Sequence, residues 1–559
     1  MMRSQVPGNG PGIVTLRAVV LGCLAVTFAL PMVAVVVLAL NPGVVSALVG
    51  RDVLQAAINS AVTAGVSGLL ATLIGAGLAV LLDRTDVRGR RHLRLLYFSP
   101  FLVPPFIGAI AWLSLLGPSG DITQAVSGLV GSSEPVFSLY GPVGITALLT
   151  IHSYPAAYII ISASLRRVPT SLEEAARLAG AGRLRTLRDV TLPLIRPALI
   201  ATFTLTAVSN LSDFGIPAIL GLPVRYYTLS TLIYKYLVSS VLDNPLQVVA
   251  AIGLVLLLVA VIAVLVQRRL SRSVQFEADG GAPPAIELGR SRTPVSVVSW
   301  AVAAVIALFP LIALLNQSLI PAPGVPLTWQ TMTFSNFTDA IAYPGALNGI
   351  INSVVLSISA ALICGILGLA IGSLITRTRS RTNVLMDLAS TLPQSIPGLV
   401  IGVGWIIAGI WVGLYNTSWV ILLAYVTAFV AFVVQSVRAP LAAASDSMEE
   451  AARISGASAV RAMIDISWRS ALPAAAAGAL LVALTAVREL TISVLLAAPG
   501  TRTLGVVIFD LQQSGDFSAA ASLSLLVVIV GLLGLGVVAS RGDGVDQSAQ
   551  KAVRSYVNN

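Results

Sequence analysis

Two short polar segments of the chain carry paired glutamates in a repeated pattern that suits recognition of a partner protein. The first reads SLEEAARLAGAGRLRTLRDVTLP over residues 171–193, and the second reads SMEEAARISGASAVRAMIDISWR over residues 447–469. Each opens with Ser-x-x-Glu, the pattern of a capping box, whose two side chains bond free amides in the first turn of a helix. We therefore expect a short helix to begin at the serine of each segment.

Each of these expected helices has a smooth face made mostly of small residues. The residues that share it by i, i+3, i+4 and i+7 spacing are Leu172, Ala175, Ala176 and Ala179, and in the second segment Met448, Ala451, Ala452 and Ser455. Gly180 and Gly456 should stop the helices and let the chain turn. A short helix with such a face is suited to lie in a groove of a partner.

Three charged residues interrupt apolar stretches, where charges are costly and are usually functional or paired. Arg488 and Glu489 lie in LTAVRELTISVLL, and Asp213 lies in VSNLSDFGIPAIL. We expect Asp213, Arg488 and Glu489 to line the outer part of a pathway or its gate, where acidic groups would suit a cation in transit. A polar contact that only orders the helices is the alternative. Residues 215–217, Gly-Ile-Pro, should break the helix, and broken helices at depth often line cavities.

Residue types for catalysis, metal binding or nucleotide binding are scarce. Two cysteines and two histidines are too few and too scattered for a metal cluster or a disulfide framework. A phosphate-binding loop needs Gly-x-x-x-x-Gly-Lys-[Ser/Thr], but the two lysines, Lys235 and Lys551, follow Tyr234 and Gln550. We therefore expect no catalytic residue, no metal site and no cofactor in this chain.

The composition indicates a helical membrane protein. The chain has 559 residues, of which 56% are hydrophobic and 10% charged, with a mean hydropathy of +0.90. Soluble domains carry about 25% charged residues, so a water-soluble globular protein is excluded. The net charge of +10 could suggest nucleic acid, but the places of the charges point to membrane topology instead.

Twelve apolar stretches are long enough to cross a bilayer, which takes about 20 residues. They lie at 13–40, 56–82, 95–117, 142–165, 195–220, 246–267, 296–319, 350–376, 384–414, 418–438, 473–497 and 518–539. With a cytoplasmic N-terminus, the cytoplasmic segments hold 29 of the 34 basic residues, which is strong positive-inside asymmetry. We expect a multi-pass membrane protein with both termini in the cytoplasm.

The spans form two repeats. Residues 59–85 match residues 352–378 at an offset of 293, and residues 173–177 match residues 449–453 at an offset of 276. Six spans in each repeat is an even number, so the two repeats insert in parallel. The expected divisions are a first repeat at 1–270 with its core at 50–265, a cytoplasmic linker at 271–295, and a second repeat at 296–559 with its core at 345–540.

The two polar segments resemble the signature of membrane subunits of binding-protein-dependent ATP-binding cassette (ABC) importers. That signature is Glu-Ala-Ala, a glycine, and an Ile-x-Leu-Pro ending; the second segment departs from it where Trp468-Arg469 replaces Leu-Pro. The resemblance implies an all-α fold of the type I importer, MetI-like class, and a coupling helix in each segment that docks in a cleft of an ATPase subunit. The residues to which it assigns this coupling are Glu173, Glu174, Ala175, Ala176, Gly180, Glu449, Glu450, Ala451, Ala452 and Gly456.

The same resemblance implies the partners. They are two copies of an ABC ATPase subunit, which would bind ATP and magnesium, an extracytoplasmic substrate-binding protein or lipoprotein, and the lipid bilayer, with no nucleic acid. It also implies that Glu174 and Glu450 pair with basic groups of the ATPase, although each could instead only cap its own helix. The chain itself would then be no enzyme.

Within this family the chain looks most like ferric-iron permeases. The segments that carry this likeness are SDFGIPAILG at 212–221 and RELTISVLLAAPGTRTLGVVIFDLQ at 488–512. Fused permeases for thiamine, 2-aminoethylphosphonate and polyamines are the alternatives. A secondary transporter driven by an ion gradient would also fit twelve spans, but it gives no reason for two Glu-Ala-Ala helices.

Overall fold

The computed structural model describes residues 6–7, 10–40, 50–238, 244–270 and 286–531. Most of these residues are helical. Ten helical segments are long and apolar enough to cross a membrane, or up to twelve if each of two bent pairs is one span. The expectation of an all-α membrane protein with about twelve spans is therefore confirmed.

The chain folds as two compact units that are interleaved along the sequence. Unit 1 comprises residues 1–86, 140–288 and 344–510, and unit 2 comprises residues 87–139, 289–343 and 511–559. These units do not coincide with the expected repeats, whose boundaries describe sequence similarity and stay a prediction. Of the expected linker, residues 271–285 lie outside the described residues, and so does the end of the last expected span, residues 532–539.

Three long helices of each repeat form the core of unit 1. They are α4 (Arg51–Arg84), α8 (Pro142–Leu165) and α11 (Leu192–Ser212) in the first repeat, and α17 (Ala346–Arg377), α20 (Ser418–Ala443) and α23 (Arg469–Val487) in the second. Small residues let these helices approach closely, which is how helices associate in lipid. A Cβ atom at Gly75 of α4 would lie 2.8 Å from the Cβ of Ala157 in α8, and one at Gly368 of α17 would lie 2.6 Å from the Cβ of Val433 in α20.

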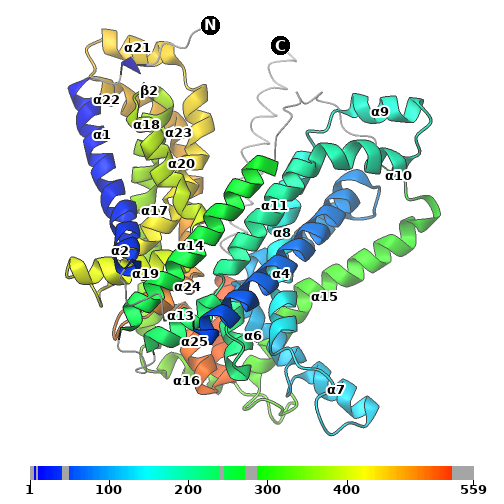
Figure 1. Ribbon diagram of the computed structural model, residues 1–559. Helices are drawn as coiled ribbons and strands as arrows, with labels where there is room; N and C mark the ends of the chain where they lie inside the picture. Colours follow the sequence, from blue (N-terminus) through cyan, green and yellow to red (C-terminus); the bar gives the residue numbers. More distant parts are fainter. Residues whose placement is uncertain (1–5, 8–9, 41–49, 239–243, 271–285, 532–559) are drawn as a thin grey trace. The chain divides into compact units, whose positions relative to one another are not determined.

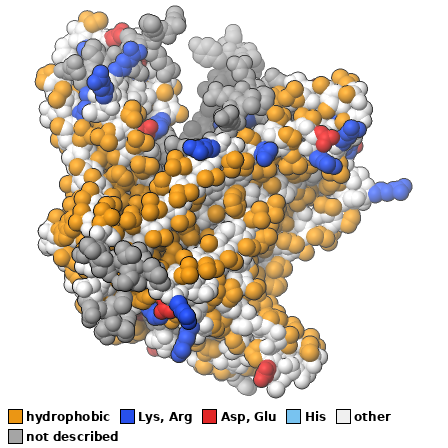
Figure 2. Space-filling model, in the orientation of Figure 1, with side chains coloured by type: hydrophobic (Ala, Val, Ile, Leu, Met, Phe, Trp, Pro, Cys, Tyr) orange, Lys and Arg blue, Asp and Glu red, His pale blue; other side chains and the backbone are white. Residues whose placement is uncertain are grey.

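The exposed sides of these core helices are apolar. Figure 2 shows hydrophobic side chains along α4 and α11, and Lys and Arg side chains near α9–α10 and α21–α22, two regions described below. On α4 the exposed apolar residues recur at helical spacing and include Leu54, Ile58, Val62, Val66 and Leu73. Such a surface is suited to contact with lipid chains.

The first span of each repeat packs against the other repeat. In unit 1, α1 (Pro11–Leu24), the π-helical turn η1 (Ala25–Ala29) and α2 (Leu30–Ala39) lie along the second repeat, with α2 beside α19 (Gly398–Trp411) (Figure 1). Thr427 Oγ1 donates to Thr27 O at 2.5 Å across this contact. In unit 2, α15 (Arg292–Leu319) packs on α5 (Arg90–Leu102) and α6 (Pro105–Leu116) of the first repeat. This exchange is why the compact units cut across the repeats.

The remainder of unit 2 surrounds α15. It consists of α7 (Asp121–Val130), α16 (Ser335–Ala342), the turn η5 (Gly289–Ser291) and an apolar helix at 517–531. Tyr97 Oη donates to Ser299 O at 3.0 Å, and Gln317 Nε2 donates to Ser518 Oγ at 3.1 Å. The helix α7 belongs to the longer loop of the first repeat, since α19 and α20 are joined directly by a short turn at 412–417.

The segment before each exchanged helix pairs with the residues after the first core helix of a repeat. Strand β1 (Val6–Pro7) runs parallel to β2 (Thr378–Arg379), and Ile286 makes a parallel bridge with Thr85. Thr85 and Thr378 occupy equivalent positions at the offset of 293. The end of the expected linker is thus held in place at Ile286.

The third expected span of each repeat is broken rather than continuous. The stretch at 95–117 breaks between α5 and α6, and the stretch at 384–414 bends by 113° between α18 (Thr382–Thr391) with η6 (Leu392–Ser395) and α19. Pro104 and Pro397, equivalent in the repeats, precede the second helix of each pair. Proline lacks an amide proton and keeps the preceding residue from helical geometry, which explains both breaks.

Candidate functional site

Both Glu-Ala-Ala segments form the expected short helices. They are α9 (Thr170–Leu178) and α21 (Asp446–Ile454), each followed by a single turn, α10 (Arg183–Thr186) or α22 (Ala459–Ala462), and by a π-helical turn, η3 (Leu187–Thr191) or η7 (Met463–Trp468). In each repeat this series of short helical elements leads directly into the next core helix, α11 or α23.

The expected capping boxes are wrong. Ser171 and Ser447 are the second residues of their helices, and no side-chain bond caps either helix start. In the first segment Pro169, with φ of −60°, lets the helix begin one residue earlier, at Thr170. In the second, the hydroxyl of Ser447 bonds that of Ser445 at 2.6 Å instead.

The expected glycine stops are confirmed. Gly180 has φ of +86° and Gly456 has φ of +92°, a region that glycine enters without steric penalty. Ala181 N donates to Ala176 O at 3.0 Å, and Gly180 N donates to Arg177 O at 2.9 Å. This is the Schellman arrangement, and the equivalent bonds occur at the end of α21.

The outward face of each helix carries a large apolar residue that the sequence analysis did not single out. Leu178 is 90% exposed and Ile454 is 88% exposed, and the two are equivalent at the offset of 276. Ala175 and Ala451 are exposed beside them, whereas Ala176 and Ala452 are half-buried. The repeat offset, applied to the large apolar residues just before Gly180 and Gly456, could have revealed this pair from sequence.

The two glutamates of each pair face in opposite directions. Glu173 and Glu449 are each 4% exposed, and Glu174 and Glu450 are exposed. Glu173 Oε2 accepts from Arg84 Nη1 at 2.9 Å, and its Oε1 accepts from Thr191 Oγ1 at 2.7 Å. The inner glutamate of the first segment is therefore bound within this chain.

The second repeat holds its inner glutamate in the same way. Glu449 Oε1 lies 3.3 Å from Arg377 Nε and accepts from the hydroxyl of Ser467. Arg377 Nη1 also lies 2.7 Å from Asp446 Oδ1, in the first turn of α21. Glu174 and Glu450, the other members of the two pairs, have exposed side chains instead.

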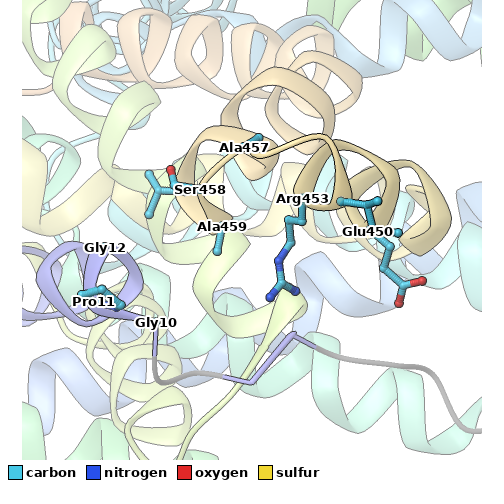
Figure 3. A pocket seen from close by; sticks show the side chains of 10 residues that line it. Gly10, Pro11, Gly12, Glu450, Arg453, Ala457, Ser458 and Ala459 are labelled. Atoms are coloured by element: carbon cyan, nitrogen blue, oxygen red, sulfur yellow. The ribbon is translucent and has the colours of Figure 1, made fainter.

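A cavity of about 650 Å³ lies beside α21. Figure 3 shows the side chain of Arg453 extending toward the chain near Gly10, whereas the side chain of Glu450 points away from Gly10. The lining comes from the start of α1 at 10–12, from α21, and from the turn at 457–460. The start of the exchanged helix α1 thus borders the second Glu-Ala-Ala helix.

The two acids expected in apolar stretches lie at breaks between helices. Asp213 follows α11 and precedes α12 (Gly215–Gly221), and Glu489 follows α23 and precedes α24 (Thr491–Leu496). The expected break near 215–217 is confirmed, one turn earlier than the proline.

Each of these carboxylates binds the free amides of the short helix that follows it. Asp213 Oδ1 accepts from Ile216 N at 2.9 Å, and Glu489 Oε1 accepts from Ile492 N at 2.6 Å. Glu489 Oε2 also accepts from Ser493 N at 2.9 Å and Ser493 Oγ at 2.8 Å. Arg488, which is half-buried, is the C-cap residue of α23. The structure thus places both acids as helix caps, the polar contact considered as the alternative to a pathway role.

Three aromatic rings meet beside the first break. Phe214, next to Asp213, lies 5.2 Å from Tyr234 and 5.5 Å from Phe509, and the last two are 5.8 Å apart between ring centres. Tyr234 comes from α13 (Leu229–Val238) of the first repeat and Phe509 from α25 (Leu504–Ser514) of the second. The cluster therefore joins the two repeats within unit 1.

Within the described residues, no three His, Cys, Asp or Glu side chains are grouped so that they could hold a metal ion.

The chain matches a family described as "Binding-protein-dependent transport system inner membrane component" over residues 71–276 and 365–542. The chain belongs to this family. It is a multi-pass permease of an ABC importer, with one family domain in each repeat, and each domain contains one Glu-Ala-Ala helix and one acid-capped break.

Relatives of this permease cover most of its length. It is 26% identical over 505 residues, 87% of each chain, to "Probable ABC transporter permease protein y4fN" of Sinorhizobium fredii. It is 23% identical over 462 residues, 82% of this chain and 84% of the relative, to "Fe(3+)-transport system permease protein FbpB 2" of Haemophilus influenzae. A further Haemophilus influenzae protein, "Putative ferric transport system permease protein FbpB 1", is 31% identical over 185 residues, 33% of this chain and 29% of the relative.

Proposed function

We propose that this permease conducts ferric iron, delivered by an extracytoplasmic binding protein, across the bacterial inner membrane. The observation that carries the proposal is similarity along 82% of the chain to a relative named as an Fe(3+)-transport permease. The two segments that resemble iron permeases, 212–221 and 488–512, form the acid-capped breaks and α25. They lie where a pathway between the repeats would run.

Selectivity for the cargo resides in the binding protein in this proposal. The described part of the chain groups no three His, Cys, Asp or Glu side chains as ferric ligands, and hard cations such as ferric iron need oxygen-rich ligand sets. The permease would then provide a passage that opens and closes.

ATP hydrolysis would be carried out by two copies of a separate ATPase subunit, which bind ATP and magnesium. One copy would dock on α9 and the other on α21, through the exposed Leu178 and Ile454 and the outward Glu174 and Glu450. Both helices and both termini would face the cytoplasm, because 29 of the 34 basic residues fall on that side of the expected topology.

Phe214, Tyr234 and Phe509 would close the outer end of the passage in this conformation. Phe214 and Phe509 are fully buried, and rings from both repeats must separate before cargo can pass between the repeats. Asp213, Arg488 and Glu489 would act beside this closure by holding the broken helices α12 and α24. A neutral Asp213→Asn, Glu489→Gln permease should assemble normally but lose uptake; normal uptake would reject a pathway role for the two charges.

The cargo is tested by reconstituting the permease with its ATPase and binding protein in liposomes. Uptake of radiolabelled ferric iron should require ATP inside and binding protein outside, and should resist excess thiamine, 2-aminoethylphosphonate and spermidine. Competition by one of these compounds would replace iron as the cargo. Uptake driven by an ion gradient without any ATPase would reject the importer mechanism itself.

A further inference from the structure

One buried arginine ends the first core helix of each repeat. Arg84 is the last residue of α4 and Arg377 the last residue of α17, and they are equivalent at the offset of 293. Both guanidinium groups are buried, a position that arginine rarely takes unless it is paired. The sequence analysis used these residues only to align the repeats.

In the first repeat this arginine joins several elements at one point. Its Nη1 donates to Glu173 of α9 at 2.9 Å, and its Nη2 donates to Leu165 O, at the end of α8, at 2.8 Å. Glu173 in turn accepts from Thr191, the last residue of η3 before α11. The ends of α4 and α8, the helix α9 and the start of α11 are thereby bonded together.

The second repeat builds the same junction from different residues. Arg377 contacts Glu449 of α21 at 3.3 Å and donates to Ala444 O at 3.0 Å and Leu441 O at 3.4 Å, at the end of α20. Glu449 accepts from Ser467 of η7, which leads into α23. The offset of 276 maps Leu441, Glu449 and Ser467 onto their first-repeat counterparts Leu165, Glu173 and Thr191.

These junctions are direct side-chain contacts between the Glu-Ala-Ala helices and the core. Along the chain α9 is connected to α8 by residues 166–169, and to α11 through a turn at Gly180 and the short elements α10 and η3. A push on α9 alone could be absorbed by bending at these connections. A buried ion pair resists this, because separating the partners leaves an uncompensated charge.

We propose that Arg84 and Arg377 are positioning residues that pass movement of α9 and α21 to the transmembrane bundles. The inference rests on the proposed docking of ATPase subunits on these helices. Displacement of α9 then moves the ends of α4, α8 and α11 as one body, and α21 moves α17, α20 and α23 likewise. ATP-driven movement of the two helices is thereby converted into movement of the walls of the passage.

The two junctions differ in one carboxylate, which provides an internal test. Among the described residues, Arg377 pairs with both Glu449 and Asp446, whereas Arg84 pairs with Glu173. Thr170 occupies the position in α9 that corresponds to Asp446. Loss of Glu173 should therefore uncouple the first repeat more strongly than loss of Glu449 uncouples the second.

The experiment uses the complete transporter, permease with ATPase subunits and binding protein, in liposomes. Glu173→Gln keeps an acceptor for Thr191 but removes the ion pair. It should leave ATPase association and hydrolysis within about twofold of wild type, while transport per ATP hydrolysed falls about tenfold or more. Adding Thr170→Asp, which copies the second repeat, should restore transport per ATP. The matched control is Asp189→Asn, which removes an exposed ion pair with Arg185 in the same segment and should change neither quantity.

Two results would overturn the proposal. One is unchanged transport per ATP in Glu173→Gln, and the other is a parallel loss of transport, hydrolysis and ATPase binding, which would make the junction a folding element only. Hydrogen exchange on the purified wild-type and Glu173→Gln permeases tests the junction without any cargo or ATPase. Faster exchange over 170–180, with α4 and α8 unchanged, is expected; identical exchange would reject the junction even if ferric iron proves the wrong cargo.

Discussion

The packing of α4 on α8 makes a sharp prediction at Gly75. A methyl group there would lie 2.8 Å from Ala157 Cβ and from Tyr158 N, whereas ordinary contacts are at least 3.4 Å. The helices would have to separate by roughly 0.6 Å, and such overpacking costs about 1–3 kcal/mol. Since backbone atoms form part of the contact, a change of rotamer cannot relieve it. Gly75→Ala should therefore destabilise the permease.

The measurement is thermal unfolding of purified permease in detergent, followed by loss of the monodisperse peak. Gly75→Ala should lower the midpoint by about 2–12 °C, given roughly 2–4 °C per kcal/mol for chains of a few hundred residues. The control is Gly77→Ala, two residues along the same helix, where an added Cβ meets nothing within 4 Å. Equal unfolding midpoints for the two variants would refute the packing argument.

Three further predictions concern docking and gating. Changing Leu178 and Ile454 to Asp should weaken ATPase binding by about tenfold or more without changing permease stability. Burying an exposed apolar side chain in the interface stabilises binding by roughly 1.5–3 kcal/mol, whereas burying a carboxylate there would destabilise it. Binding is measured by co-purification and titration. Changing Glu174 and Glu450 to Gln should lower ATPase affinity by about tenfold, since a charge-assisted hydrogen bond contributes roughly 1.5–3 kcal/mol, and affinity that is unaltered would remove the proposed ion pairs with the ATPase. Phe509→Ala should open the outer closure, so that liposomes containing the permease leak a small fluorescent cation; a tight liposome would argue against the aromatic gate.

Matched controls separate these effects from general damage. Leu129 is 88% exposed but belongs to α7 in unit 2, so Leu129→Asp should leave ATPase binding intact. Phe337 contacts Phe334 at 6.5 Å between ring centres, within unit 2, so Phe337→Ala removes an aromatic contact that is not part of the proposed closure. Leakage in this control equal to that of Phe509→Ala would show that the assay reports loosened packing.

Much of the overall architecture of this protein could be predicted from its sequence. Apolar length, the distribution of arginines and the two offsets predict a two-repeat helical membrane protein, because each can be read from the order of residues along the chain without knowledge of their contacts. The same holds for the turns at Gly180 and Gly456, where a left-handed residue must follow the last turn. The breaks at Pro104 and Pro397 agree with the preference of proline for helix starts, where its missing N–H costs no hydrogen bond, but proline alone does not predict them, since Pro155 lies inside the continuous helix α8.

The tertiary structure alone decided which member of each glutamate pair serves the chain and which faces outward. Glu173 and Glu174 are adjacent and chemically identical. Their roles differ because Arg84, 89 residues away from Glu173 along the chain, lies on the buried side of α9 and pairs with Glu173. Tertiary packing also placed α1 against the second repeat and turned Asp213 and Glu489 into caps of the helices that follow them. Such contacts join segments that are distant along the chain or depend on where a helix actually breaks, and neither hydropathy nor periodicity records them.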